Sequence, residues 1–194
     1  MPYIALVEEP RGLLGRVSFR WGRRKFGKDV QPLQAAAHHN GLLLASGAVE
    51  TIAERGWKAL DPRLRWLAIQ RVSSSIGCSW CIDYGFYLGH QAGVDPAKVV
   101  DVSTWRDSTA YDEIERLVLE YAESASTTPA TVDPEVVKTL TDRLGEKAMV
   151  ELAAWVALEH FRSRFNAGLG LRSQGFAESC AVPGATSSQL KVAG

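Results

Sequence analysis

Hydrophobic residues recur along most of this chain at spacings of three and four, which places them on one face of an α-helix. The clearest case is a run whose apolar positions are Leu64, Leu67, Ala68, Val72 and Ile76. Asp61-Pro62 precedes the run, and aspartate as a cap followed by proline in the first turn is a strong helix start. The pattern therefore predicts a helix over 62–76 that ends at Gly77.

The same periodicity, together with Gly, Pro and Asp at segment ends, predicts helices along the rest of the chain. Their expected ranges are 30–55 with a break at Gly47, 78–92, 96–102, 109–126, 134–144 and 146–165. The last of them is apolar nearly all round, so it should be central or lie at an interface. No segment alternates with a period of two, and the predicted fold class is all-α.

The 194 residues divide by composition into three parts. Residues 1–30 are predicted to be an N-terminal arm, 31–170 a helical domain and 171–194 a Gly- and Ser-rich tail. The arm interleaves basic and aromatic side chains between Arg11 and Lys28, and its glycines disfavour a long helix. Packing on the body or on a neighbouring subunit is favoured over nucleic-acid binding, because the total charge is neutral.

Composition narrows the class of protein without naming a function. Hydrophobic residues make up 46% of the chain, as in ordinary folded proteins. The 22 Lys and Arg balance 22 Asp and Glu, so the net charge gives no reason to expect nucleic acid or an anionic membrane as a partner. The first residues lack a secretory signal pattern and no apolar run is long enough for a membrane span. Together with only 3 cysteines, this predicts a cytoplasmic protein whose thiols stay reduced.

The most informative motif is Cys78-Ser79-Trp80-Cys81, directly after Gly77. Cysteines three apart share a helix face, and the free N–H groups at a helix start stabilise a thiolate. Reversible disulfide chemistry is thus available without a metal or cofactor. The alternatives are two inert structural cysteines, or a zinc site, for which the further ligands would come from Cys180, His38, His39, His90 and His160.

Three segments together resemble a known family. They are Arg63-Leu64-Arg65-Trp66-Leu67-Ala68-Ile69-Gln70-Arg71-Val72, Ile76-Gly77-Cys78-Ser79-Trp80-Cys81, and Gly93-Val94-Asp95 before a short valine-rich helix. This core is similar to the alkylhydroperoxidase D (AhpD) and carboxymuconolactone decarboxylase family, with weaker similarity over 109–170. The resemblance implies an AhpD-like helical bundle in 31–170 and assembly as a trimer or hexamer. A dimer is the alternative, because one self-complementary helix would also bury the apolar surface.

In the peroxidase branch of that family, the resemblance implies that Cys81 reacts with peroxide and Cys78 resolves the product. A glutamate and a histidine serve there as a proton relay, but the matching positions of this chain hold Trp66 and Gly85. Weak peroxidase activity is therefore expected. Tyr84, three residues after Cys81, is the better candidate than Asp83 for a catalytic substitute because it shares the helix face of Cys81, but core packing is favoured as its role.

Other ionisable side chains would have to come from neighbouring helices; those considered are Glu50, Glu54, His38, His39 and His160. His90 is rejected because nine residues turn it about 180° away from Cys81.

Three functions remain open from the sequence. The first is a cysteine-dependent oxidoreductase of alkylhydroperoxidase type, which reduces a small hydroperoxide and is recycled by a thiol or dithiol reductant. The second is a cofactor-free lyase of the carboxymuconolactone decarboxylase type, and the third is a helical oligomer without enzymatic activity that binds a small apolar ligand.

Overall fold

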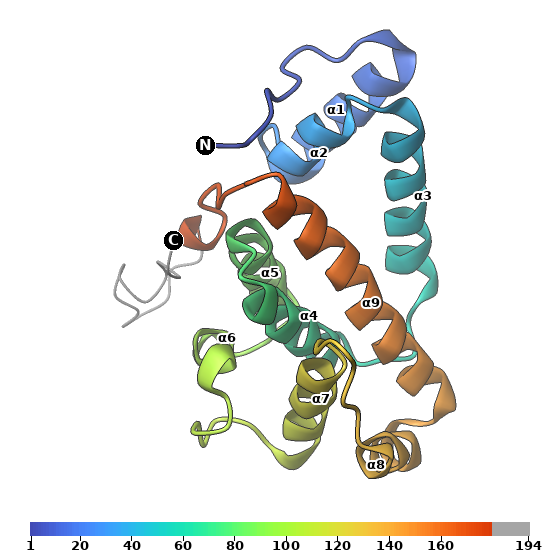
Figure 1. The fold of residues 1–194 in the computed structure, drawn as a ribbon, viewed down its shortest axis with the longest axis vertical. Coiled ribbons are helices and arrows are strands. Elements are labelled where there is room, and N and C mark those ends of the chain that lie inside the picture. The colour runs from blue at the N-terminus through green and yellow to red at the C-terminus, as the bar shows by residue number, and fades with distance from the viewer. Residues whose placement is uncertain (180–194) are drawn as a thin grey trace. The chain divides into compact units, whose positions relative to one another are not determined.

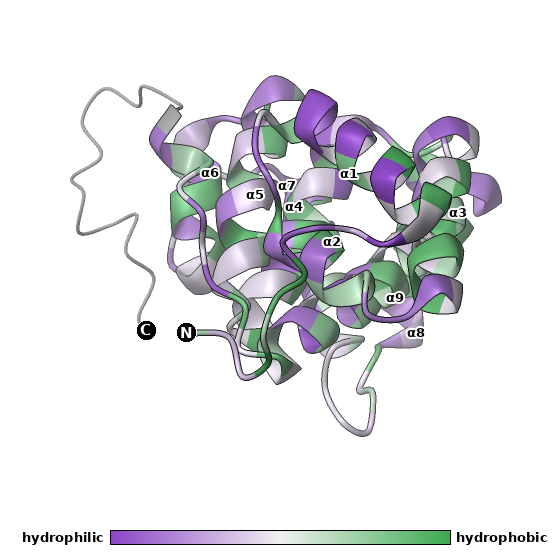
Figure 2. Cartoon of the chain, turned by 90° about the horizontal axis from the view of Figure 1, so that it is seen from above, coloured by the Kyte–Doolittle hydropathy of each residue, from purple (hydrophilic) through white to green (hydrophobic). Residues whose placement is uncertain are grey.

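The structure is a computed structural model that describes residues 1–179 (Figure 1). These residues form α-helices and two short 3-10 helices, with no strand among them, so the all-α prediction is confirmed. Figure 2 shows hydrophilic and hydrophobic stretches alternating along most helices, as expected where one face of each helix packs inward. Within 1–179, no helix combines the length and apolarity that crossing a bilayer requires.

The chain forms two compact units. The first is Met1–Trp57 with Gly168–Arg172, and the second is Lys58–Ala167 with the chain from Ser173 onward. The division after Trp57 differs from the predicted boundary after residue 30. The predicted arm is thus part of a larger unit that also holds the segment 31–57.

The first unit contains α1 (Gly12–Phe26), α2 (Gln31–Ala36) and α3 (Asn40–Gly56). The expectation that glycines disfavour a long helix at 11–28 was wrong. A Cβ on Gly15 would lie 2.9 Å from Pro10 Cβ, and one on Gly22 would lie 2.7 Å from Leu33 Cδ2. These two glycines serve close packing within a continuous helix.

The expected break at Gly47 was also wrong, because the chain breaks at residues 37–39 instead. His39 caps α3 there, its Nδ1 accepting a hydrogen bond of 3.1 Å from the Leu42 N–H. Gly47 lies inside α3, whose helical conformation continues past it.

The second unit carries the cysteines. Its helices are α4 (Pro62–Ile76), α5 (Ser79–Gln91), α6 (Pro96–Asp101), η1 (Val102–Thr104), α7 (Glu113–Ser124), α8 (Pro134–Leu144), α9 (Glu146–Gly168) and η2 (Ala177–Ser179). Leu67, Val72, Val118, Leu119 and Leu152 are fully buried and form the centre of its core. The predicted Asp-Pro starts are present, with Asp61 accepting from the Arg63 N–H at 2.8 Å and Asp95 from the Ala97 N–H at 2.9 Å.

Candidate functional site

The turn between α4 and α5 positions the cysteine pair. Gly77 has a φ of 76°, which glycine adopts without strain, and this conformation ends α4. The N–H groups of Gly77 and Cys78 both donate to the Ser73 carbonyl, at 3.0 and 3.1 Å. Cys78 therefore becomes the N-cap of α5, and its sulfur accepts a hydrogen bond of 3.3 Å from the Cys81 N–H.

The two cysteines are free thiols in contact with each other. Their sulfurs lie 2.6 Å apart, with the Cys81 thiol paired to the Cys78 sulfur. Both side chains are buried, since Cys78 is 1% and Cys81 6% exposed. A disulfide needs a separation of about 2.05 Å, so the sulfurs have to move little when an oxidant removes two electrons and the two thiol protons are lost.

The surroundings of the two sulfurs are electrostatically different. Hydrogen bonding from the Cys81 thiol lowers the pKa of Cys78, with further help from the Cys81 backbone N–H. Burial raises the pKa of Cys81 well above its ordinary value, and the hydrogen bond with Cys78 acts in the same direction. The reduced pair therefore favours a thiolate on Cys78 and a proton on Cys81.

One face of α9 lies against the cysteines and is polar. Glu159, Ser163 and Asn166 occupy it at spacings of four and three, and none is more than 2% exposed. Asn166 Nδ2 donates to Cys81 Sγ at 3.2 Å, while its Oδ1 is buried without a hydrogen-bond partner. Hydrogen bonding from Ser163 lowers the pKa of Cys78.

Glu159 is the carboxyl group of this site. Its Oε1 accepts hydrogen bonds from Ser163 Oγ at 2.6 Å and from Ser73 Oγ of α4 at 2.9 Å. Arg162, one turn along α9, lies 3.4 Å from Oε2. Burial raises the pKa of Glu159, and the attraction of Arg162 opposes that shift.

The sequence pattern, which predicts a helix apolar nearly all round at 146–165, does not reveal Glu159, Ser163 and Asn166 as site residues. Their signal is present in retrospect, because polar residues at i, i+4 and i+7 of an otherwise apolar helix mark one buried polar stripe. Recognising that the stripe faces Cys78 and Cys81 requires the packing of α9 against α4 and α5.

Tyr84 and Trp80 lie in an aromatic cluster on α5. The Tyr84 ring is 5.1 Å from the rings of both Trp80 and Phe176 and stacks at 6.3 Å on Tyr87. These contacts show the packing role of Tyr84, and its predicted catalytic role stays a prediction.

Asp83 holds the segment that carries Phe176 onto α5. Its carboxylate accepts from Ser173 Oγ at 2.8 Å and from the N–H groups of Gln174 and Ala177 at 2.8 and 2.7 Å. The first part of the predicted tail is thus bound to α5 by three hydrogen bonds.

Trp66 and Gly85, which stand where the family relay has glutamate and histidine, are both closely packed. Trp66 is buried, with the Arg65 guanidinium 5.0 Å from its ring centre. A Cβ on Gly85 would lie 2.3 Å from Gln70 Nε2, so the Gln70 amide occupies the space of a side chain at 85. Gln70 is fully buried, donates to the Ile82 carbonyl at 3.2 Å and leaves its Oε1 without a partner.

The histidines have other surroundings. In the first unit, His38 Nε2 pairs with the Ala5 carbonyl at 2.8 Å and His39 caps α3. His90 is outside the core. Over residues 1–179 no three His, Cys, Asp or Glu side chains gather as metal ligands would, and Cys180 lies outside the described residues.

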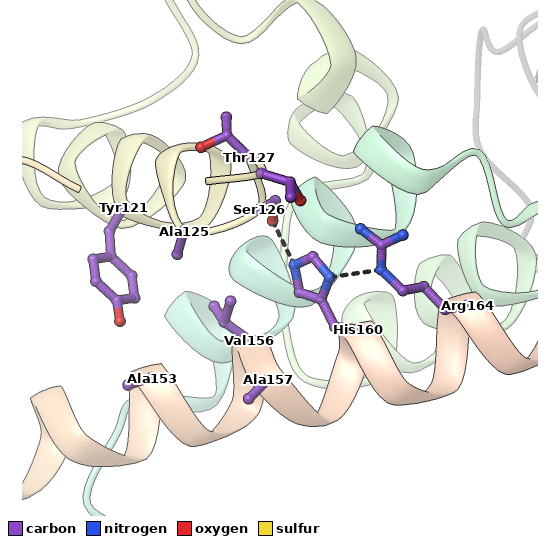
Figure 3. A pocket seen from close by; sticks show the side chains of 10 residues that line it. Tyr121, Ala125, Ser126, Thr127, Ala153, Val156, Ala157, His160 and Arg164 are labelled. Atoms are coloured by element: carbon purple, nitrogen blue, oxygen red, sulfur yellow. Dashed lines mark hydrogen bonds between the residues drawn. The ribbon is translucent and has the colours of Figure 1, made fainter. Parts of the chain in front are cut away.

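His160 lines a hollow of about 520 Å³ between α7 and α9 (Figure 3). One ring nitrogen pairs with Ser126 Oγ at 2.9 Å, and the other accepts from Arg164 Nε at 3.4 Å. An acceptor at Nδ1 leaves the proton on Nε2, which then donates to Ser126, so His160 is not arranged as a base that activates this serine.

The comparisons with known proteins decide the family. The sequence pattern of the carboxymuconolactone decarboxylase family matches residues 45–124. The uncharacterized protein YnjA of Escherichia coli (strain K12) is 30% identical over 161 residues, covering 83% of this chain and 87% of YnjA. The chain belongs to the AhpD-like carboxymuconolactone decarboxylase family.

Solved structures agree with this assignment. The debrominase Bmp8, as a variant in complex with 2,3,4-tribromopyrrole, is 25% identical with a TM-score of 0.74, covering 92% of this chain and 97% of Bmp8. A peroxidase-related protein from Silicibacter sp. TM1040 shares the fold at a TM-score of 0.79 and 17% identity, covering 91% of this chain and 94% of that protein. These two proteins, which share the fold of this chain, are thus named for different reactions, one as a debrominase and the other as peroxidase-related.

Proposed function

We propose that this protein is a dithiol oxidoreductase, in which Cys78 and Cys81 reduce a small substrate by two electrons and become a disulfide. The observation that carries the proposal is the buried pair of free thiols with sulfurs 2.6 Å apart. The lowered pKa of Cys78 beside a protonated Cys81 adds a nucleophile and its resolving partner.

A small hydroperoxide is the first substrate class. The Cys78 thiolate attacks the distal peroxide oxygen, the O–O bond breaks, and an alcohol leaves once its oxygen takes up a proton. Cys81 then displaces the hydroxyl group of the Cys78 sulfenic acid, which gives the disulfide and water. Two thiols or one dithiol from a reductant restore the pair by exchange.

This order assigns the first attack to Cys78, whereas the family resemblance implies Cys81. The assignment rests on electrostatics, because hydrogen bonding with the Cys81 side chain lowers the pKa of Cys78, and the Cys78 sulfur accepts the backbone N–H of Cys81. A thiolate is favoured where donors converge on the sulfur. Trapping of the sulfenic acid in Cys81→Ser, and its absence in Cys78→Ser, would support this order.

Reductive dehalogenation of a small aromatic ring is the second candidate. Bmp8 is called a debrominase, and this chain aligns with almost all of it at 25% identity. The same dithiol supplies the two electrons, since a bromopyrrole and two thiols give the debrominated pyrrole, hydrogen bromide and a disulfide.

The experiment compares both substrate classes in one assay. Reduced protein is mixed with cumene hydroperoxide or with 2,3,4-tribromopyrrole, and substrate loss is followed together with the loss of two hydrogens from the protein mass. Cys78→Ser and Cys81→Ser should abolish turnover, while Cys180→Ser serves as the matched control and should keep it. Substrate conversion by the variant with both Cys78→Ser and Cys81→Ser would refute a dithiol mechanism.

A further inference from the structure

We propose that Glu159 exchanges protons with the cysteine pair, as the general acid and base of this chain in place of the glutamate and histidine that Trp66 and Gly85 replace. The proposal deepens the dithiol function and rests on it. It assigns a role to a residue of α9, a helix far along the chain from the Cys-x-x-Cys motif.

The geometry places Glu159 in the site as a buried carboxyl group. It is 2% exposed, and its Oε1 meets the hydroxyls of Ser73 and Ser163. Ser73 also supplies the carbonyl that holds the N–H of Cys78, and Ser163 bonds toward the sulfurs from the same helix face as Asn166. Hydroxyls that can both donate and accept are suited to pass a proton between a carboxyl group and a thiol.

The groups around Glu159 come from three sides. Arg162 lies 3.4 Å away on its own helix, Ser73 approaches from α4, and Cys78 and Cys81 face it from the start of α5. Because burial raises the pKa of Glu159, its proton affinity moves from that of an ordinary carboxylate toward that of a thiol. A matched affinity favours transfer in both directions.

The proton balance follows from a starting state with the Cys78 thiolate, the Cys81 thiol and protonated Glu159. When Cys78 attacks, the Glu159 proton goes to the departing alkoxide. The resulting carboxylate takes the proton of Cys81 as that thiol attacks the Cys78 sulfenic acid, and it returns this proton to the departing hydroxide as water. The cycle leaves one disulfide, one alcohol, one water and an ionised Glu159.

The test uses diamide, an oxidant that converts two thiols to a disulfide while it becomes a hydrazine, and so does not depend on the natural substrate. Disulfide formation is timed between about pH 5 and 9 by alkylation of the remaining thiols, for wild type, Glu159→Gln and Glu151→Gln. Glutamine keeps the hydrogen bonds of Ser73 and Ser163 but accepts no proton, so we expect Glu159→Gln to slow the reaction about 10²-fold near neutral pH.

Glu151 is the matched control, because it is also a buried glutamate of α9. Its carboxylate accepts from the backbone N–H groups of Lys58, Ala59 and Leu60, at 2.7 to 3.0 Å. We expect Glu151→Gln to keep the wild-type pH profile, in which the rate falls as Glu159 ionises and is no longer available as the general acid. In Glu159→Gln this fall should be absent, because glutamine does not titrate.

An unchanged pH profile in Glu159→Gln, or equal slowing in both variants, would overturn the proposal. Infrared difference spectra of wild type, oxidised minus reduced, test it without a variant, because a protonated carboxyl band should disappear as a carboxylate forms. No carboxyl change would equally overturn it. If these results hold while neither hydroperoxide nor bromopyrrole is consumed, the proposed substrates fail and the role of Glu159 stands.

Discussion

Gly85 is the position at which the structure makes its most quantitative prediction. Replacing it with alanine puts a Cβ 2.3 Å from Gln70 Nε2 and 3.1 Å from Gln70 Cδ, both closer than unstrained atoms approach. Gln70 is fully buried, so its amide must move within a packed core and leave the Ile82 carbonyl that it now meets at 3.2 Å. We therefore expect Gly85→Ala to destabilise the protein although alanine is the better helix former.

The magnitude follows from three contributions. Overpacking of a core costs about 1–3 kcal/mol, and an unpaired buried polar group costs about 1–3 kcal/mol more. Exchanging glycine for alanine inside a helix returns about 1 kcal/mol. The net loss should be about 1–5 kcal/mol, which for a chain of 194 residues lowers the melting temperature by about 2–20 °C.

Urea and thermal unfolding of reduced protein measure this loss. Gly47→Ala is the matched control, because a Cβ on this helical glycine meets nothing within 4 Å and the variant should be stabilised by about 0.5–1 kcal/mol. Shortening Gln70 to alanine should rescue Gly85→Ala, with a coupling energy above about 1 kcal/mol in the double-mutant cycle. A Gly85→Ala protein as stable as wild type, or strictly additive variants, would refute the reasoning. Restoring a relay with Trp66→Glu and Gly85→His accordingly requires Gln70→Ala as well.

Four further predictions follow from the site and the surface. The raised pKa of Glu159 favours its neutral form in the folded protein, so the contribution of Glu159 to stability is lost as the pH rises through that pKa. Between about pH 5 and 8, the free energy of unfolding should therefore fall less for Glu159→Gln than for wild type. An equal fall would contradict this. Asp83→Ala removes three hydrogen bonds and should cost about 2–4 kcal/mol and speed amide exchange at 173–177, whereas unchanged exchange would show that the segment is held otherwise. Tyr84→Phe keeps the ring contacts with Trp80 and Phe176, so its rate of disulfide formation should stay within about twofold of the wild-type rate. If the Tyr84 hydroxyl acted as a general acid or base, the rate should instead fall about 10²-fold. One face of α1 is apolar and exposed, with Leu13, Val17 and Trp21 at 79%, 57% and 52%. If a trimer or hexamer buries this face, light scattering should give a mass well above 21.2 kDa, and deletion of residues 1–28 should lower it. A mass of 21.2 kDa for the full chain would contradict assembly.

The helices were largely predictable from the sequence because their signals are local. Apolar spacing and Asp61-Pro62 gave the bounds of α4 without error, and Gly77 ended it as predicted. The proximity of Cys78 and Cys81 was equally accessible, since three residues of helix bring two side chains together whatever the rest of the chain does. Glycine was the misleading signal, because Gly15, Gly22 and Gly47 look alike in sequence while their neighbours differ.

Only the tertiary structure decided what surrounds the sulfurs. Ser73 and Glu159 are 86 residues apart, and Asn166 and Cys81 are 85 apart, so no local pattern relates them. Their meeting depends on the packing of α9 against α4 and α5, which is set by side-chain volumes along whole helices. The same packing puts the Gln70 amide where a side chain at 85 would lie and buries the carboxyl group of Glu159 beside the cysteine pair. Chemistry carried by neighbouring residues is thus readable from the sequence, and chemistry assembled across helices is not.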